Sequence, residues 1–193
     1  MRKSRMRGIL GVALLAMIAA PAHAAPPRWT LDSAHSKLIF SAQQGSETFN
    51  GGFNKFATEI VFDADDLEHS HIATTVDMAS AFAGSAERDQ ALPGGGWFNV
   101  AGFPDAKFVT KTIRKTGAHE FIADAVLTIR GVSKDVQLPF TLTAGTAPGQ
   151  MHAVGAVTIL RNDYGVGQGE FASDSWIKFE VKVGIDILAT KVK

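Results

Sequence analysis

Two histidines, His69 and His71, have the residue type and spacing of a metal-binding pair. On an extended segment, residues two apart lie on the same side, so both imidazoles could reach one ion. The same stretch contains Asp65, Asp66 and Glu68, which is typical of a solvated turn. The sequence therefore favours a surface turn here, and no metal ion is predicted.

Asp32, His35 and Ser36 supply the residue types of a nucleophilic triad. They are close neighbours in the chain, beside one predicted strand, whereas a triad needs a base and an orienting group that converge on an exposed nucleophile. A structural hydrogen-bonding role is therefore favoured, and no catalytic residue is predicted. The alternative hypothesis is a metal- or redox-responsive enzyme or accessory protein that uses His35, His69 and His71.

Arg88 and Asp89 are adjacent charges near the middle of the chain. Burying either charge alone is costly, so their adjacency indicates compensation by each other or by nearby groups. Two interpretations stay open: an anchor for a loop at the mouth of a cavity, or contact with the polar head of a ligand. Arg161 and Asp163 admit the same two interpretations.

The stretch after this pair combines Pro93-Gly94-Gly95-Gly96 with the large aromatic rings of Trp97, Phe98, Phe103 and Phe108. Proline and consecutive glycines cannot continue a regular element, so the rings follow in a loop or an irregular strand start. This arrangement suits the mouth of a β-barrel with a lined cavity, where the glycine run would be the hinge of an aromatic lid. The alternative is that the rings only cap a hydrophobic core.

The beginning of the chain has the features of a secretory signal peptide. Four basic residues among the first seven precede an apolar run, residues 9–20, and then Ala22-His23-Ala24. The run is shorter than the about 20 residues of a transmembrane helix. We expect cleavage after Ala24, a periplasmic location, and one mature domain over residues 25–193.

Composition narrows the function classes further. The chain has 19 Lys and Arg against 19 Asp and Glu, and removing the four basic residues of the leader leaves a net charge of about −4. An acidic balance argues against a nucleic-acid partner. Cysteine is absent, so neither disulfides nor thiolate chemistry is available.

The mature chain reads as a series of strands in which apolar and polar residues alternate. The clearest is the last, in which Ile177, Phe179, Val181, Val183, Ile185 and Ile187 alternate with polar residues or glycine. About eight strands are predicted, with turns that include Gly51-Gly52, and one or two short helices within residues 83–91 or 64–70. Such strands either stack as a sandwich or close as a barrel, and periodicity alone leaves this choice open.

A series of motifs resembles the YceI-like family of lipocalin-like, polyisoprenoid-binding proteins. The motifs span the mature chain in order: Trp29 to Phe40, Gly52-Phe53-Asn54-Lys55-Phe56, Ile60 to Asp63, Glu87-Arg88-Asp89 with Leu92, Trp97 to Val100, Phe103-Pro104 with Phe108, Leu127 to Lys134, and Leu160 to Gly167. The resemblance implies an all-β fold, a closed antiparallel barrel of about eight strands with an elongated apolar cavity. It also implies a ligand such as a polyisoprenoid, a quinone tail or a fatty amide, and pairing as a homodimer. Many relatives carry histidine where this chain has Gln44 and Gln90-Ala91, so amide hydrogen bonding would replace any role of those histidines here.

The sequence thus predicts a non-enzymatic periplasmic carrier or sequestering protein for a long-chain amphiphile, without a cofactor and with transient membrane or membrane-protein contact. A barrel of this size holds one slender ligand. We expect Gln44, Arg88 and Asp89 at the polar end of the site. The expected apolar lining consists of Leu38, Phe40, Ala42, Phe53, Phe56, Val76, Met78, Trp97, Phe98, Phe103, Phe108, Leu127, Ile129, Phe140 and Phe179.

Overall fold

The computed structural model describes residues 25–193, so the predicted leader, residues 1–24, lies outside the described residues. Within the described part, no helix is long and apolar enough to cross a membrane. The elements in chain order are β1 (Arg28–Leu31), β2 (Lys37–Gln44), β3 (Glu47–Phe53), β4 (Phe56–Val61), β5 (His71–Asp77), η1 (Met78–Ser80), β6 (Ala81–Phe82), α1 (Ala86–Ala91), β7 (Asp105–Lys115), β8 (Glu120–Ile129), β9 (Val132–Ala144), β10 (Gln150–Leu160), η2 (Arg161–Tyr164), η3 (Gly169–Phe171) and β11 (Ile177–Lys191).

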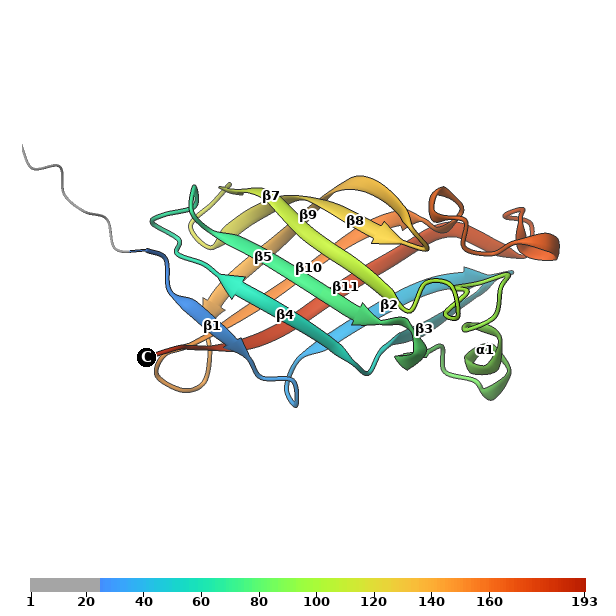
Figure 1. Cartoon of the computed structure of the whole chain (residues 1–193), viewed down its shortest axis with the longest axis horizontal. Helices are drawn as coiled ribbons and strands as arrows, with labels where there is room; N and C mark the ends of the chain where they lie inside the picture. Colours follow the sequence, from blue (N-terminus) through green and yellow to red (C-terminus); the bar gives the residue numbers. More distant parts are fainter. Residues whose placement is uncertain (1–24) are drawn as a thin grey trace, which may run out of the picture.

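The strands form one antiparallel sheet that closes on itself (Figure 1). β11 pairs with β10 on one side and with both β1 and β2 on the other. β4 pairs with β1 and β5, while β3 pairs with β2 and β6. The segments β1–β2, β3–β4 and β5–β6 are therefore three interrupted barrel strands, and with β7 to β11 they complete an eight-stranded barrel. The predicted closed barrel is confirmed, and the sandwich is excluded.

The break between β1 and β2 explains Asp32, His35 and Ser36. Asp32 Oδ1 accepts hydrogen bonds from the backbone N–H groups of Ala34 and His35, and its Oδ2 lies 2.9 Å from His35 Nδ1. Ser36 Oγ donates to the carbonyl of Leu188 and accepts from the Leu188 N–H. The three residues thus form a turn and fasten it to β11, which is the structural role favoured by the sequence.

Gly51-Gly52 does not form the expected turn but lies inside β3. The reason is close packing: a Cβ at Gly51 would lie 2.2 Å from the Phe82 carbonyl oxygen and 2.4 Å from the Phe40 ring. Glycine inside a strand commonly marks such a close approach. Of the two helix predictions, the first is confirmed by α1, whose N-cap is Ser85, while residues 64–70 contain turns and bends without a helix.

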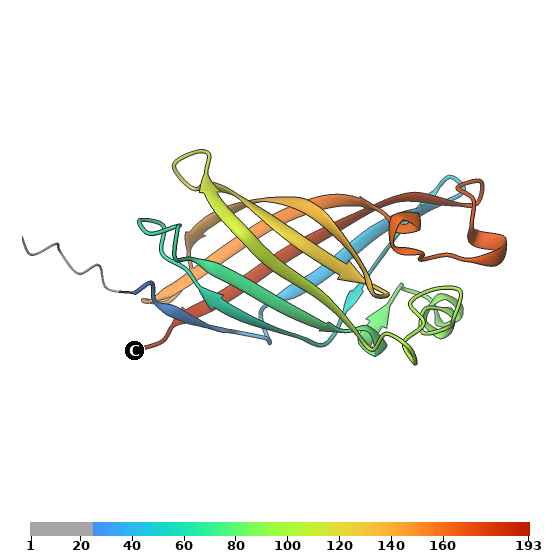
Figure 2. The same ribbon diagram turned by 45° about the horizontal axis from the view of Figure 1, so that its top comes forward.

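The two ends of the barrel differ. At the end near the C-terminus, the rings of Phe62, Phe121 and Phe140 pack together, and the Phe121 and Phe140 centroids are 5.4 Å apart in a stacked arrangement. At the other end lie two long segments, residues 83–104, which include α1, and residues 161–176, which include η2 and η3 (Figure 2). The barrel interior is therefore limited at one end by an aromatic plug, formed by these three rings, and at the other end by two covering segments.

Candidate functional site

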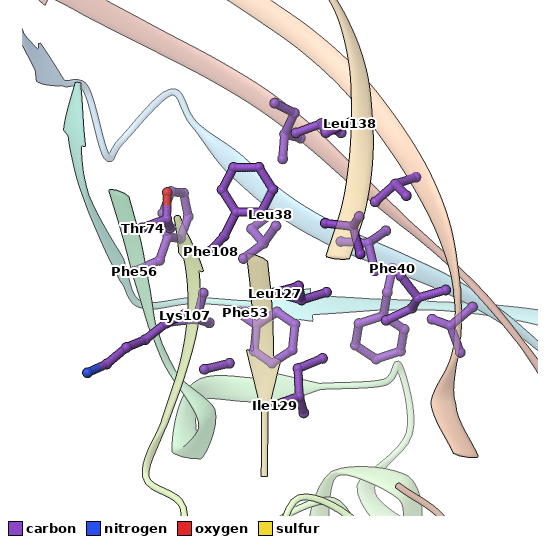
Figure 3. Close-up of a pocket in the computed structure, with 18 of the residues that line it drawn as sticks. Leu38, Phe40, Phe53, Phe56, Thr74, Lys107, Phe108, Leu127, Ile129 and Leu138 are labelled. Carbon is purple, nitrogen blue, oxygen red and sulfur yellow. The ribbon is translucent and has the colours of Figure 1, made fainter. Parts of the chain in front are cut away.

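An elongated apolar cavity of about 240 Å³ occupies the interior (Figure 3). Its walls are the inward-facing side chains of the barrel strands, together with residues from the two covering segments. Val157, Val183 and Ile185 face inward in a closed barrel and yet are only half-buried, because they border open space. In a close-packed interior such residues would be fully buried. The cavity is therefore a chamber and not a packing defect.

Most of the residues predicted to bind a ligand line this chamber. Those that do are Leu38, Phe40, Ala42, Phe53, Phe56, Val76, Met78, Trp97, Phe98, Phe108, Leu127, Ile129 and Phe140. They come from β2, β3, β4, β5, β7, β8 and β9, from η1, and from the covering segment 83–104. The alternation in the sequence thus assigned inward faces correctly on these strands, while ligand contact by these residues stays a prediction.

Gln44, Arg88 and Asp89 are brought together at the covered end but do not line the chamber. Arg88 donates from Nε to the Ala83 carbonyl and from Nη1 to Gln44 Oε1, and its guanidinium lies 4.6 Å from the Phe49 ring centroid. Asp89 Oδ1 accepts from the Ala83 N–H at 2.5 Å. The two charges hold the loop between β6 and α1, so the structure favours the anchoring interpretation over the polar end of a ligand site.

Phe103 and Phe179 also lie away from the chamber, each for a local reason. The Phe103 ring packs on Gly131 at the β8–β9 turn, where a Cβ would lie 2.9 Å from the ring. In β11, a register shift between Ile177 and Val181 interrupts the alternation. Phe179 falls within this shift and lies against Arg161, whose guanidinium carbon is 5.2 Å from the ring centroid.

Few polar side chains reach the chamber. The hydroxyls of Thr58 and Thr74 hydrogen-bond each other across β4 and β5. Lys107 contributes to the lining, but its ammonium extends away from it (Figure 3). Arg161 and Tyr164 line the covered end. Thr58, Thr74 and Tyr164 were missed as site residues, although the alternation of β5 through Thr74 could have indicated the second of them.

The comparisons with known proteins agree with this geometry. The YceI-like domain family matches residues 29–189. The chain belongs to the YceI-like family. A UPF0312 protein of Pseudomonas putida is 29% identical over 179 residues, which is 90% of this chain and 92% of the relative, and one of Shewanella sp. strain MR-4 is 28% identical over 173 residues, 86% and 88% of the two chains.

Solved structures show the same YceI-like barrel. The crystal structure of Burkholderia cenocepacia BcnA has a TM-score of 0.78 and 28% identity, covering 83% of this chain and 99% of that one. A domain of Saccharophagus degradans described as polyisoprenoid-binding has a TM-score of 0.67 and 13% identity, covering 85% and 98% of the two chains. At that identity the second likeness shows the fold alone.

In this YceI-like chain, segment 83–104 is fastened over the chamber by backbone contacts. The carbonyl of Gly96 accepts hydrogen bonds from the N–H groups of Gly167 and Gln168, at 2.9 and 2.7 Å. Arg130 donates to the Trp97 carbonyl, and the Trp97 ring lies 5.0 Å from that of Phe171. Hydrogen bonds and a ring contact therefore connect the two covering segments and the β8–β9 turn to one another.

The expected hinge at Gly94-Gly95-Gly96 needs correction. None of the three glycines has a positive φ, and a Cβ at Gly95 or Gly96 would meet no atom closer than 3.8 Å. Alanine can therefore replace Gly95 and Gly96, whereas a Cβ at Gly94 would lie 3.0 Å from the Ala91 carbonyl oxygen. The run makes ordinary turns, and the contacts that hold the cover lie at Gly96 and Trp97.

The histidines of the alternative hypothesis lie on the surface, each beside a carboxylate. His69 Nδ1 is 2.7 Å from Asp66 Oδ1, and this hydrogen bond with its negative charge raises the pKa of His69 above its usual 6.5. The hydrogen bond from His35 lowers the pKa of Asp32. Over residues 25–193, no cluster of three or more His, Asp or Glu side chains has the arrangement of a metal site. No observation favours this hypothesis over ligand binding in the chamber.

Proposed function

We propose that this protein binds one long-chain amphiphile inside its barrel and carries or sequesters it, without catalysis. The observation that carries the proposal is the chamber itself, which is closed at one end, covered at the other and lined almost entirely by carbon. Ligand pockets are commonly apolar with few polar groups that fix orientation. The ligand classes that fit are a polyisoprenoid, the tail of a quinone and a fatty amide.

Burial of the tail supplies the affinity. Each methylene moved from water into the chamber contributes about 0.8 kcal/mol, so a chain of a few isoprene units binds tightly without polar contacts. Such a ligand is insoluble in water, and a covered barrel shields it during transfer. The polyisoprenoid-binding description of the Saccharophagus degradans neighbour makes prenyl lipids the first class to test.

A periplasmic location is part of the proposal and rests on the leader, residues 1–24. Intact-mass measurement of the exported protein tests it: the chain should begin at Ala25 and appear in the soluble periplasmic fraction. Retention of the leader, or extraction only by detergent, would contradict the location. Pairing as a homodimer and transient membrane contact stay expectations from the family.

The ligand can be identified by mass spectrometry of an organic extract from protein purified without detergent from its own host. We expect a prenyl lipid, quinone or fatty amide in stoichiometric amount. Protein whose chamber is blocked by Val157→Trp provides the matched control and should yield none. An extract without lipid from the unmodified protein, together with tightly bound metal, would support the metal-dependent alternative and overturn the proposal.

A further inference from the structure

One end of the chamber carries a polar site that the lining otherwise lacks. Arg161 and Tyr164 are the first and last residues of η2, and both line the chamber. Residues three apart on a 3₁₀ turn lie one above the other, so the two side chains share a side of the helix. They are 3% and 2% exposed. A guanidinium and a phenol from one short turn are thus buried at the covered end.

The guanidinium has no donor left for a ligand. Its Nε donates to the Lys178 carbonyl, its Nη1 to the carbonyls of Val166 and Gly167, and its Nη2 to those of Ser173 and Ile177. These contacts engage the donor directions of the group with backbone oxygens. What Arg161 offers the chamber is therefore a buried positive charge, which favours an electron-rich atom nearby.

The hydroxyl of Tyr164 has the opposite property. It makes no hydrogen bond with any residue of the described chain, 25–193, although the residue is almost completely buried. Burial raises the pKa of Tyr164, with the nearby Asp163 carboxylate as a smaller cause, so the hydroxyl keeps its proton. No side-chain N or O atom that lacks a partner is sealed off over residues 25–193, so this hydroxyl stays reachable by a water-sized group, and such a donor is normally satisfied by an acceptor. An acceptor atom of a ligand would satisfy it.

Among the other lining residues, the Trp97 indole N–H lies at the same covered end and makes no hydrogen bond within residues 25–193, so it adds a second open donor there. The far end is plugged by the Phe62, Phe121 and Phe140 rings, and the Thr58 and Thr74 hydroxyls are engaged with each other. We propose that the ligand lies with its tail toward the plug and its polar head at η2, where the Tyr164 hydroxyl donates a hydrogen bond to one acceptor oxygen of the head. This inference rests on the proposed amphiphile binding and adds the orientation of the ligand and the class of its head.

The number of available hydrogen-bond donors determines which ligand head group fits the site. A quinone or amide carbonyl needs one donor and carries a partial negative charge, which the Arg161 charge stabilises. A phosphate or diphosphate brings full charges that require several donors once they leave water. With two neutral donors, the Tyr164 hydroxyl and the Trp97 indole N–H, and none in Arg161, the site accommodates the neutral carbonyl and disfavours the phosphate.

The test measures the affinities of the delipidated protein and of Tyr164→Phe for three polyisoprenoids: a prenylated benzoquinone, squalene, which has no head, and a polyprenyl monophosphate. We expect Tyr164→Phe to weaken quinone binding about threefold to tenfold, the loss of one hydrogen bond, and to leave squalene unchanged. The phosphate should bind less well than the quinone. Because the substitution removes only a hydroxyl that bonds to nothing in the protein, the fold should be kept, and circular dichroism checks this.

A second readout gives the orientation directly, because quinones quench tryptophan fluorescence at short range. Trp97 lines the covered end of the chamber, whereas Trp29 donates to the Phe62 carbonyl at the plugged end. In variants that keep one of the two as the only tryptophan, we expect strong quenching of Trp97 and little of Trp29.

Several results would overturn the inference: quinone affinity that is unchanged in Tyr164→Phe, equal losses for quinone and squalene, tighter binding of the phosphate, or quenching of Trp29 in place of Trp97. A loss that appears in Thr74→Val instead would move the head to the middle of the barrel and also overturn it. If the unmodified protein binds none of the three lipids, the proposed function itself fails, which is a different result.

Discussion

Replacement of Val157 by tryptophan separates a chamber from a packed core. Val157 lies on β10 opposite Val183 of β11, and both line the cavity while only half-buried. The next residue, Thr158, faces solvent on the same strand. Because successive side chains of a strand point to opposite faces, Thr158→Trp is a matched control with the same new side chain on the outside.

The magnitudes follow from what the indole displaces. If it takes the place of one five-carbon isoprene unit, binding loses about 4 kcal/mol, or roughly a thousandfold in affinity. The lipid-free protein has room for the new ring, so its free energy of unfolding should change by about 1 kcal/mol or less. That corresponds to about 2–4 °C in melting temperature for a domain of this size.

The assay compares prenyl-lipid binding with thermal unfolding of delipidated protein for both variants. We expect Val157→Trp to lose binding with a nearly unchanged melting temperature, and Thr158→Trp to keep both. Inserting a larger side chain into a filled core lowers the free energy of unfolding by about 1–3 kcal/mol or more. A strongly destabilised lipid-free Val157→Trp would therefore show a close-packed interior, and normal lipid binding by this variant would show that the chamber is not the site.

Three further predictions concern the cover, the plug and a surface pair. Arg130→Ala removes the donor to the Trp97 carbonyl and should speed lipid exchange, measured by stopped-flow fluorescence, whereas replacing Gly95-Gly96 by two alanines should leave the exchange rate and melting temperature nearly unchanged. Phe140→Ala should lower the free energy of unfolding by about 3–5 kcal/mol in denaturant titrations, because it opens a hole in the ring stack. In an NMR titration, His69 should have a pKa above 6.5 that falls in Asp66→Asn; since the raised pKa favours the folded state, this contribution is present below pH 6.5 and is lost as the pH rises through the folded-state pKa. An unperturbed His69 would contradict the hydrogen bond.

The sequence was sufficient to predict the long strands, because inward-facing apolar residues alternate with polar ones along them. β8 and β9 follow the predicted pattern through Leu127, Ile129 and Phe140. The short segments β1, β3 and β6 were not predicted, since β6 has only two residues and β3 contains the glycines that accommodate Phe40. Closure depends on pairing between the chain's first and last strands, which periodicity does not encode.

The site was predictable where it is apolar and not where it is polar. Charged residues were predicted to contact a ligand head, but Arg88 donates to the Ala83 carbonyl and to Gln44 Oε1 instead. The register shift in β11 that removes Phe179 from the chamber has no signature in the alternation. The open hydroxyl of Tyr164 emerges only when every hydrogen bond around η2 is known, because the sequence does not show which donors find partners.

Native mass spectrometry of the protein purified without detergent from its own host tests the central claim, that the barrel encloses one amphiphile. The chamber predicts a mass increment of one long-chain lipid per chain, which is released on gas-phase activation and is missing from Val157→Trp. Detection of the protein at the mass of the lipid-free chain would contradict ligand binding in the barrel interior. Detection of the same lipid bound to Val157→Trp would contradict it as well.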